Sequence, residues 1–188
     1  HTSVSIKIAK YRNIKIKNKE NFQLIFNLTP FFPEGGGQVG DKGFIFNSNE
    51  KIIINDTKKE NGIIVHDVDK LPKNIKTSFD AKVDEARRIK IMKNHSATHL
   101  LHFALRKVLG KHVEQKGSLI NSSYLRFDFS HFSKLTNEEI SSVESQVNQF
   151  IRAAHNLKED RNVPIEIAKQ KGAMMLFGEK YGDSVRTI

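Results

Sequence analysis

Two histidines lie four positions apart in the segment NHSATH, residues 94–99. On a helix this spacing puts the imidazoles of His95 and His99 on one face, where they can bind one metal ion, above all zinc. The peptidase motif H-E-x-x-H is disfavoured, because Ser96 takes the place of its general-base glutamate. His102 is expected to be a neighbour of the pair and not a ligand. The alternative is that both histidines are ordinary surface or core residues.

A second unusual segment is the glycine-rich stretch 34–41, EGGGQVGD. Its consecutive glycines are Gly35, Gly36 and Gly37. Such glycines let backbone N–H groups approach a phosphate, a ribose or a carboxylate, although an ordinary turn is the alternative. The segment lacks the Lys-Ser/Thr ending of a P-loop and is not the dinucleotide fingerprint. Thr29 and Gln38 bracket the glycines and could select a substrate hydroxyl or orient a water.

Basic side chains gather in two parts of the chain. One group precedes the histidines and consists of Arg87, Arg88, Lys90 and Lys93. The other is near the amino terminus and consists of Lys7, Lys10, Arg12, Lys15, Lys17 and Lys19. With 31 Lys and Arg against 21 Asp and Glu, the net charge is +10, which favours a polyanionic partner such as nucleic acid. A solvated surface that keeps the protein soluble is the alternative.

The composition bounds the class of protein. Of its 188 residues, 38% are hydrophobic and 28% charged, which suits a globular protein with one core or two closely packed sub-cores. There is no cysteine, so any metal must be held by histidine, carboxylate or water. No apolar run approaches the roughly 20 residues of a membrane span, and no signal-peptide stretch is present. We therefore expect a cytoplasmic protein without a membrane partner.

The first part of the chain reads as strands, because apolar and polar residues alternate. The expected strands are Ser3–Ala9, Asn21–Thr29, Gly43–Asn47, Lys51–Asn55, Gly62–Asp67 and Ser78–Val83. Ser-Asn, Lys-Lys-Glu-Asn-Gly and Leu-Pro-Lys-Asn segments read as turns between them. Short strands at this spacing predict a small barrel-like sub-domain over residues 1–83, with the glycine-rich segment as a shaped loop.

From Asp84 the period becomes helical and predicts one long helix, or two consecutive ones, ending at Gly110. A hairpin is expected from Glu114–Ile120 and Tyr124–Phe129. Thr136 and Glu139 form a capping box that opens another helix. The remaining expected elements are a strand at Pro164–Ala168, a short helix at Lys169–Leu176 and a strand beginning at Val185–Ile188. Residues 84–188 are therefore expected to form a mixed α/β core, and the fold class is α+β.

Four segments together resemble the editing domains of bacterial-type alanyl-tRNA synthetases. They are TPFFPEGGGQVGD at 29–41, NHSATHLLHFALR at 94–106, the hairpin with Arg126, and GEKYGDSVR at 178–186. Free-standing AlaX-type proteins and threonyl-tRNA synthetase editing domains share the H-x-x-x-H and Y-G-D-x-V-R elements. The likeness covers essentially the whole chain. The Gly-Gly-Gln-Val-Gly-Asp segment points away from the threonyl branch.

The resemblance implies hydrolysis of the ester that joins serine or glycine to tRNA(Ala), with alanine spared. It implies that zinc is bound by His95 and His99, together with a Cys and a His of a motif expected beyond Ile188, so the chain reads as truncated before that motif. Zinc would activate a water or hold the substrate. We expect Thr29 to face the amino-acid side chain and Gln38 the scissile ester, with Gly35, Gly36, Gly37, Arg87 and Arg88 binding substrate.

Two other readings stay open from the sequence. One is a non-catalytic tRNA-binding module, in which the positive charge acts alone and the histidines are structural. The other is a free-standing trans-editing protein rather than part of a synthetase that carries an aminoacylation domain. Salt-dependent RNA binding is common to all of these readings, whereas only an enzyme releases amino acid.

Overall fold

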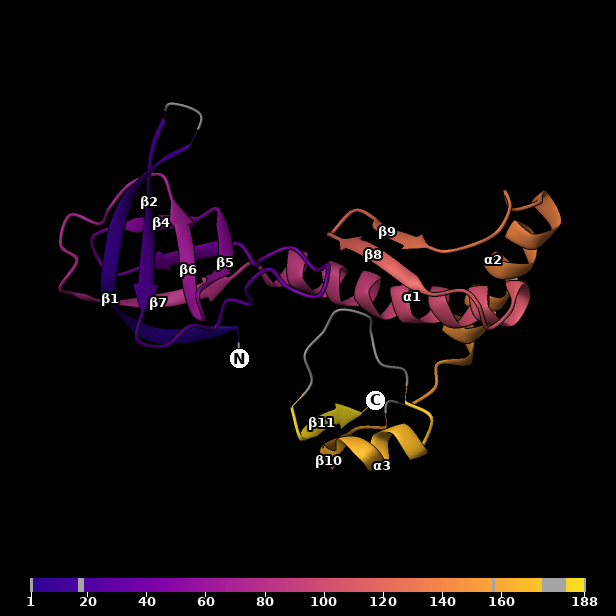
Figure 1. Cartoon of the computed structure of the whole chain (residues 1–188). Coiled ribbons are helices and arrows are strands. Elements are labelled where there is room, and N and C mark those ends of the chain that lie inside the picture. The colour runs from indigo at the N-terminus through magenta and orange to yellow at the C-terminus, as the bar shows by residue number, and fades with distance from the viewer. Residues whose placement is uncertain (1, 17–18, 157, 174–181, 188) are drawn as a thin grey trace. The chain divides into compact units, whose positions relative to one another are not determined.

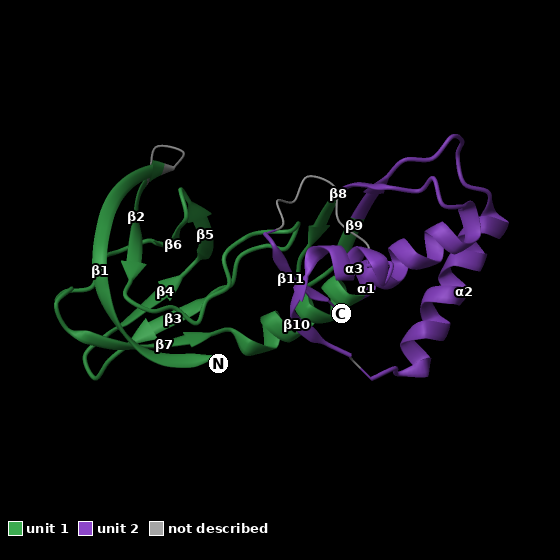
Figure 2. Ribbon diagram, turned by 60° about the horizontal axis from the view of Figure 1, so that its bottom comes forward, with its two compact units in different colours: residues 1–96, 118–126 green, residues 97–117, 127–188 purple. Residues whose placement is uncertain are grey.

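The computed structural model describes residues 2–16, 19–156, 158–173 and 182–187 (Figure 1). It is a mixed α+β protein with a large antiparallel sheet, as the sequence predicts. The chain forms two compact units, residues 1–96 with 118–126 and residues 97–117 with 127–188 (Figure 2). The sequence places a division at Asp84 instead, and that division into domains stays a prediction.

The first unit contains a seven-stranded sheet in the order β4-β3-β7-β1-β2-β6-β5. Its strands are β1 (Ser3–Ile16), β2 (Lys19–Phe26), β3 (Gly43–Phe46), β4 (Lys51–Ile54), β5 (Asp56–Glu60), β6 (Ile63–Val68) and β7 (Ser78–Val83). All neighbouring pairs are antiparallel. Within the described residues the ladder ends at β4 and β5, so closure into a barrel stays a prediction.

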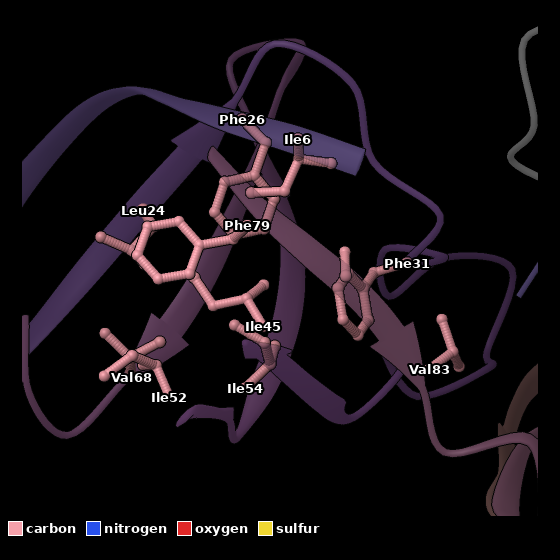
Figure 3. Close-up of a cluster of buried hydrophobic side chains, with 11 residues drawn as sticks. Ile6, Leu24, Phe26, Phe31, Ile45, Ile52, Ile54, Val68, Phe79 and Val83 are labelled. Atoms are coloured by element: carbon pink, nitrogen blue, oxygen red, sulfur yellow. The ribbon is translucent and has the colours of Figure 1, made fainter. Parts of the chain in front are cut away.

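One face of this sheet forms the core of the first unit. Alternation places inward-pointing residues on β2, β4 and β7, among them Leu24, Ile54 and Phe79, all 1% exposed or less. These side chains meet residues of β1, β3 and β6 in a single cluster (Figure 3). Burial of this cluster fixes the register of the strands, because a slip of one residue would turn each apolar side chain outward.

The expected strands are found with shifts of up to three residues at their ends, except that β1 continues seven residues beyond Ala9, and one strand was missed. Residues 58–62 were expected to be a turn, but Lys58–Glu60 belongs to β5, which pairs with β6. The turn is only Asn61-Gly62, with φ of 49° and 83°, as in the two-residue turns that join paired strands. The strand was missed because its residues are charged or polar, and only Thr57 is fully buried.

The helix predicted after Asp84 is a single one, α1 (Glu85–Leu109). The Asp84 side chain accepts a hydrogen bond from the Arg87 backbone N–H at 3.0 Å, which caps the amino end. Gly110 follows its last residue with φ of 116°, a conformation that favours glycine. The expected hairpin is also present, as β8 (Gln115–Ile120) and β9 (Leu125–Phe129). Both units include residues from α1, β8 and β9.

The second unit has its own small core around α2 (Asn137–Ala153). Thr136 and Glu139 form both hydrogen bonds of the predicted capping box. From α2, Val143 packs with Ala104, Leu105 and Val113.

The last described elements partly correct the sequence-based expectation. Residues 164–168 were expected to be a strand, but a strand, β10 (Asp160–Pro164), ends where a helix, α3 (Ile165–Gln170), begins. The pattern Ile-Glu-Ile-Ala fits a short helix as well as a strand, and Pro164 suits the position before a helix. β10 pairs with β11 (Ser184–Thr187). The helix expected at Lys169–Leu176 is also corrected, because α3 ends at Gln170 and residues 171–173 are not helical. Residues 174–176 of that expected helix, and Ile188, lie outside the described residues. No described helix has the length and apolar character needed to cross a bilayer.

Candidate functional site

The glycine-rich segment forms a tight hairpin turn. Gly35 and Gln38 exchange two backbone hydrogen bonds of 3.0 Å, with only Gly36 and Gly37 between them. The φ angles of these two glycines are 57° and 78°, so both lie in the left-handed region, as a type I′ turn requires. The local structure is therefore the ordinary turn considered above, and substrate binding by its backbone stays a prediction.

This turn is joined to β8 by backbone pairing. The Ile120 N–H donates to the Gly37 carbonyl at 2.8 Å, and the Val39 N–H donates to the Ile120 carbonyl at 3.1 Å. A Cβ atom at Gly37 would lie 2.1 Å from the Ser118 Oγ and 2.8 Å from the Ser118 carbonyl oxygen. The contact with β8 thus leaves no room for a side chain at Gly37.

The same turn brings Gln38 to His95, which joins a predicted catalytic residue to a predicted metal ligand. The His95 Nδ1 lies 2.7 Å from the Gln38 Oε1, and Gln38 is 7% exposed. Since a carboxamide oxygen only accepts, this contact assigns the proton to Nδ1. The lone pair of the neutral imidazole is then on Nε2, the nitrogen that binds a metal or a water in such pairs.

His99 follows one turn later on α1 and is exposed. The described residues contain no group of three or more His, Cys, Asp or Glu side chains able to hold a metal ion. The donor set nevertheless fits part of a zinc site, because His95 has the second hydrogen-bond partner that zinc-bound imidazoles need. Zinc binding by His95 and His99 stays a prediction.

Thr29 contacts a histidine that the sequence did not single out. Its Oγ1 lies 2.8 Å from the Nε2 of His66, a fully buried residue of β6. The His66 Nδ1 lies 3.0 Å from the Leu24 carbonyl oxygen and must donate to it, so Nε2 accepts from the Thr29 hydroxyl. Thr29 Oγ1 in turn accepts from the Phe31 N–H at 3.2 Å. Burial lowers the pKa of His66 to about 4.

The contact between Thr29 and His66 could not be found from spacing, because the two residues are far apart in the chain and His66 lies within an apolar strand. The role expected for Thr29, facing the amino-acid side chain, stays a prediction.

Arg87 and Arg88, expected to bind substrate, are held by residues that precede and follow the glycine turn. Arg88 forms an ion pair with Asp41, whose side chain is 1% exposed, and donates to the Pro30 carbonyl oxygen at 2.6 Å. Arg87 donates to the Gly40 carbonyl oxygen at 2.9 Å. These bonds anchor the segment to the start of α1. Binding of substrate by either arginine stays a prediction.

The amino-terminal basic residues are divided between two environments. Arg12 forms an ion pair with Glu60 and hydrogen-bonds Gln23. Lys7, Lys10 and Lys15 are exposed on β1. Lys17 lies outside the described residues. Of the motif GEKYGDSVR, residues 178–181 are also outside them, and the Arg186 side chain contacts Glu159 at 2.8 Å.

Comparison with known proteins finds that the chain is similar to aminoacyl-tRNA synthetase sequences. Residues 2–87 match the family described as tRNA synthetases class II (A). The chain is 55% identical over 184 residues to the alanine–tRNA ligase of Christiangramia forsetii, which is 97% of this chain and 21% of that ligase. It is 53% identical over 188 residues to the enzyme of Cytophaga hutchinsonii, 100% of this chain and 21% of that enzyme. The chain thus resembles a segment of these ligases and spans about a fifth of their length.

Proposed function

We propose that this chain is the editing domain of an alanine–tRNA ligase, which hydrolyses the ester of tRNA(Ala) mischarged with serine or glycine. The observation that carries the proposal is the hydrogen bond from His95 to Gln38, which fixes one imidazole tautomer beside a turn that has no room for a side chain at Gly37. Similarity to alanine–tRNA ligases over nearly the whole chain supports tRNA(Ala) as the substrate class.

The chemistry requires little beyond a positioned water, because an aminoacyl ester is already activated. Zinc bound with the help of His95 and His99 would polarise the ester or the attacking water. Gln38 keeps the Nδ1 proton of His95 in place, so that Nε2 presents its lone pair. The two bonds between the turn and Ile120 hold Gln38 at a constant position relative to β8.

Selection of serine over alanine rests on a polar contact. The Thr29 hydroxyl gives its proton to His66 and accepts from the Phe31 N–H, which leaves one lone pair to accept from a serine hydroxyl. Alanine offers no such donor, so the polar group would be left unpaired when alanine is bound.

The decisive experiment measures serine released from Ser-tRNA(Ala), with Ala-tRNA(Ala) as the negative control. The present chain is compared with one extended through the expected Cys and His ligands. We expect release by the extended chain and not from Ala-tRNA(Ala). Gln38→Ala should lower the rate about 10- to 100-fold, the usual loss when the partner of a metal-bound histidine is removed. Gln38→Glu, which keeps an acceptor for Nδ1, is the matched variant. An unchanged rate in Gln38→Ala would overturn the role of this contact.

A second candidate function is tRNA binding without hydrolysis. It is favoured by the net charge of +10 and by the incomplete metal-ligand set of the described residues. Salt-dependent binding of tRNA(Ala), with no serine release from either chain, would establish it in place of the editing reading.

A further inference from the structure

Three aromatic rings form a stack in the second unit, outside the site described above. His112 and His131 stack with ring centroids 5.2 Å apart and planes 21° apart, and their Nε2 and Nδ1 atoms lie 2.9 Å apart. On His112 stacks Phe132, at 4.5 Å and 29°. We call His131, His112 and Phe132 the ring stack.

The outermost ring of the stack is open to solvent. Phe132 is 87% exposed, the highest value among the large hydrophobic residues described as exposed. The Phe132 ring contacts the two histidine rings. A ligand that covered the exposed side of the phenyl ring would bury apolar surface, which is favourable.

The backbone next to the ring stack is held in place near His112 and near His131. Gly110 has φ of 116°, and a Cβ atom there would lie 3.1 Å from the His112 Nδ1, so the chain passes close beneath this ring. The Ser130 N–H donates to the Glu114 carbonyl oxygen at 3.1 Å. Ser130 Oγ also donates to the His112 carbonyl oxygen at 3.4 Å. The rings are thus presented on a preformed support.

The sequence on either side of the stack residues contains more basic than acidic side chains. From residue 106 to 134 the sequence contains six basic residues, Arg106, Lys107, Lys111, Lys116, Arg126 and Lys134, against the acidic residues Glu114 and Asp128. Lys111 directly precedes His112, and Lys134 lies two residues after Phe132; both are exposed. Glu114 is paired with Lys116.

We propose that the ring stack is a stacking platform for an unpaired RNA base, with Lys111 and Lys134 contacting the adjacent phosphates. An exposed aromatic face flanked by lysines is the combination by which proteins hold single-stranded nucleic acid. A protein partner would be expected to match an apolar patch, whereas the rings that Phe132 contacts here are both histidines. The inference rests on the RNA partner of the proposed function and adds to it a place where that RNA is held.

The test measures binding of the full chain to a short single-stranded oligoribonucleotide that contains one 2-aminopurine, whose fluorescence is quenched on stacking. A second oligonucleotide of the same length lacks every base but keeps every phosphate. We expect Phe132→Ala to weaken binding of the first about 10-fold or more and to abolish quenching, with little change for the second. Phe132→Trp should preserve both signals. Replacing Lys111 and Lys134 by Ala should weaken both oligonucleotides equally and flatten the salt dependence.

Phe132→Leu separates stacking from simple apolar contact. If Leu binds as well as Phe, or if Phe132→Ala weakens both oligonucleotides equally, the stacking proposal is overturned and the exposed ring is better assigned to a protein partner. The assay needs no hydrolysis, so its outcome is independent of the deacylation test. If Phe132→Ala releases serine and binds the oligonucleotide as the parent does, the stacking proposal is wrong and the proposed function still stands.

Discussion

At the scale of single residues, two of the three consecutive glycines, Gly35 and Gly37, have different steric surroundings. Gly37 has a positive φ and lies against Ser118, whereas a Cβ atom at Gly35 would have its nearest neighbour, the Pro33 carbonyl oxygen, at 3.9 Å. We predict that Gly37→Ala lowers the free energy of unfolding by about 2 kcal/mol or more and impairs any activity that depends on Gln38.

Gly35→Ala is the matched control, because the same methyl group is added within the same turn but meets only ordinary contact distance. Its unfolding free energy should stay within about 0.5 kcal/mol of the parent. Urea titrations of the two variants make the comparison. Equal destabilisation would show that the close contact with Ser118 does not limit this turn.

The buried histidine His66 predicts a pH dependence of stability. Its pKa in the folded protein is about 4, whereas in the unfolded chain it returns to its ordinary value near 6.5. As pH falls, the unfolded chain therefore takes up the proton first. Stability is full above pH 6.5 and is lost progressively down to pH 4, by on the order of 3 kcal/mol from this group.

Urea denaturation across this pH range measures the effect. His66→Gln should lower stability at pH 7 but flatten the pH profile, because the titrating group is gone. His155→Gln, which changes an exposed histidine, should leave the profile as in the parent. A profile that stays steep in His66→Gln would assign the dependence to other groups.

At the scale of elements, the amino end of α2 depends on one reciprocal pair. Thr136 Oγ1 accepts from the Glu139 N–H at 3.1 Å, and the Glu139 carboxylate accepts from the Thr136 N–H at 2.8 Å. Thr136→Ala should cost about 1 kcal/mol of stability, while Thr136→Ser should cost much less. Thermal unfolding of both variants tests this. Equal losses would mean that the hydroxyl does not cap the helix.

The elements that the sequence predicted best are those with a buried face or a local signal. Strand β7 was found at its exact bounds, because its buried and exposed residues alternate without a break. The capping box was found because both partners lie within one turn. Strand β5 was missed because its partners, not its own side chains, make it a strand.

The sequence singled out residue types of the candidate site but not their contacts. Glycines and paired histidines are visible as residue types, whereas the contact between Gln38 and His95 was not predicted. The ion pair of Arg88 with Asp41 and the hydrogen bond of Thr29 with His66 join residues far apart in the sequence, so motif spacing could not predict them. Sequence motifs therefore pointed to candidate residues but not to the hydrogen-bond and ion-pair partners of those residues.

At the scale of the whole molecule, the net charge of +10 predicts salt-sensitive RNA binding. The logarithm of the association constant for tRNA(Ala) should fall linearly with the logarithm of salt concentration. Replacing Lys7, Lys10 and Lys15 of β1 by Gln should reduce the slope if this strand contacts phosphates. Lys58→Gln is a control, because that lysine is already paired with Asp56 and Asp67. A slope unaffected by the triple replacement would locate the RNA elsewhere.

The strands of the first unit's sheet leave the ribosome in an order that differs from their order in the sheet. β7 is the last of its strands to leave the ribosome, yet it lies between β3 and β1 and is the strand that joins them. Until residue 83 has emerged, β3 and β4 lack their connection to the rest of the sheet, and Ile45, Ile52 and Ile54 lack part of their cover. The nascent chain therefore exposes part of a future core, and a strand edge of β3, until Val83 has left the ribosome.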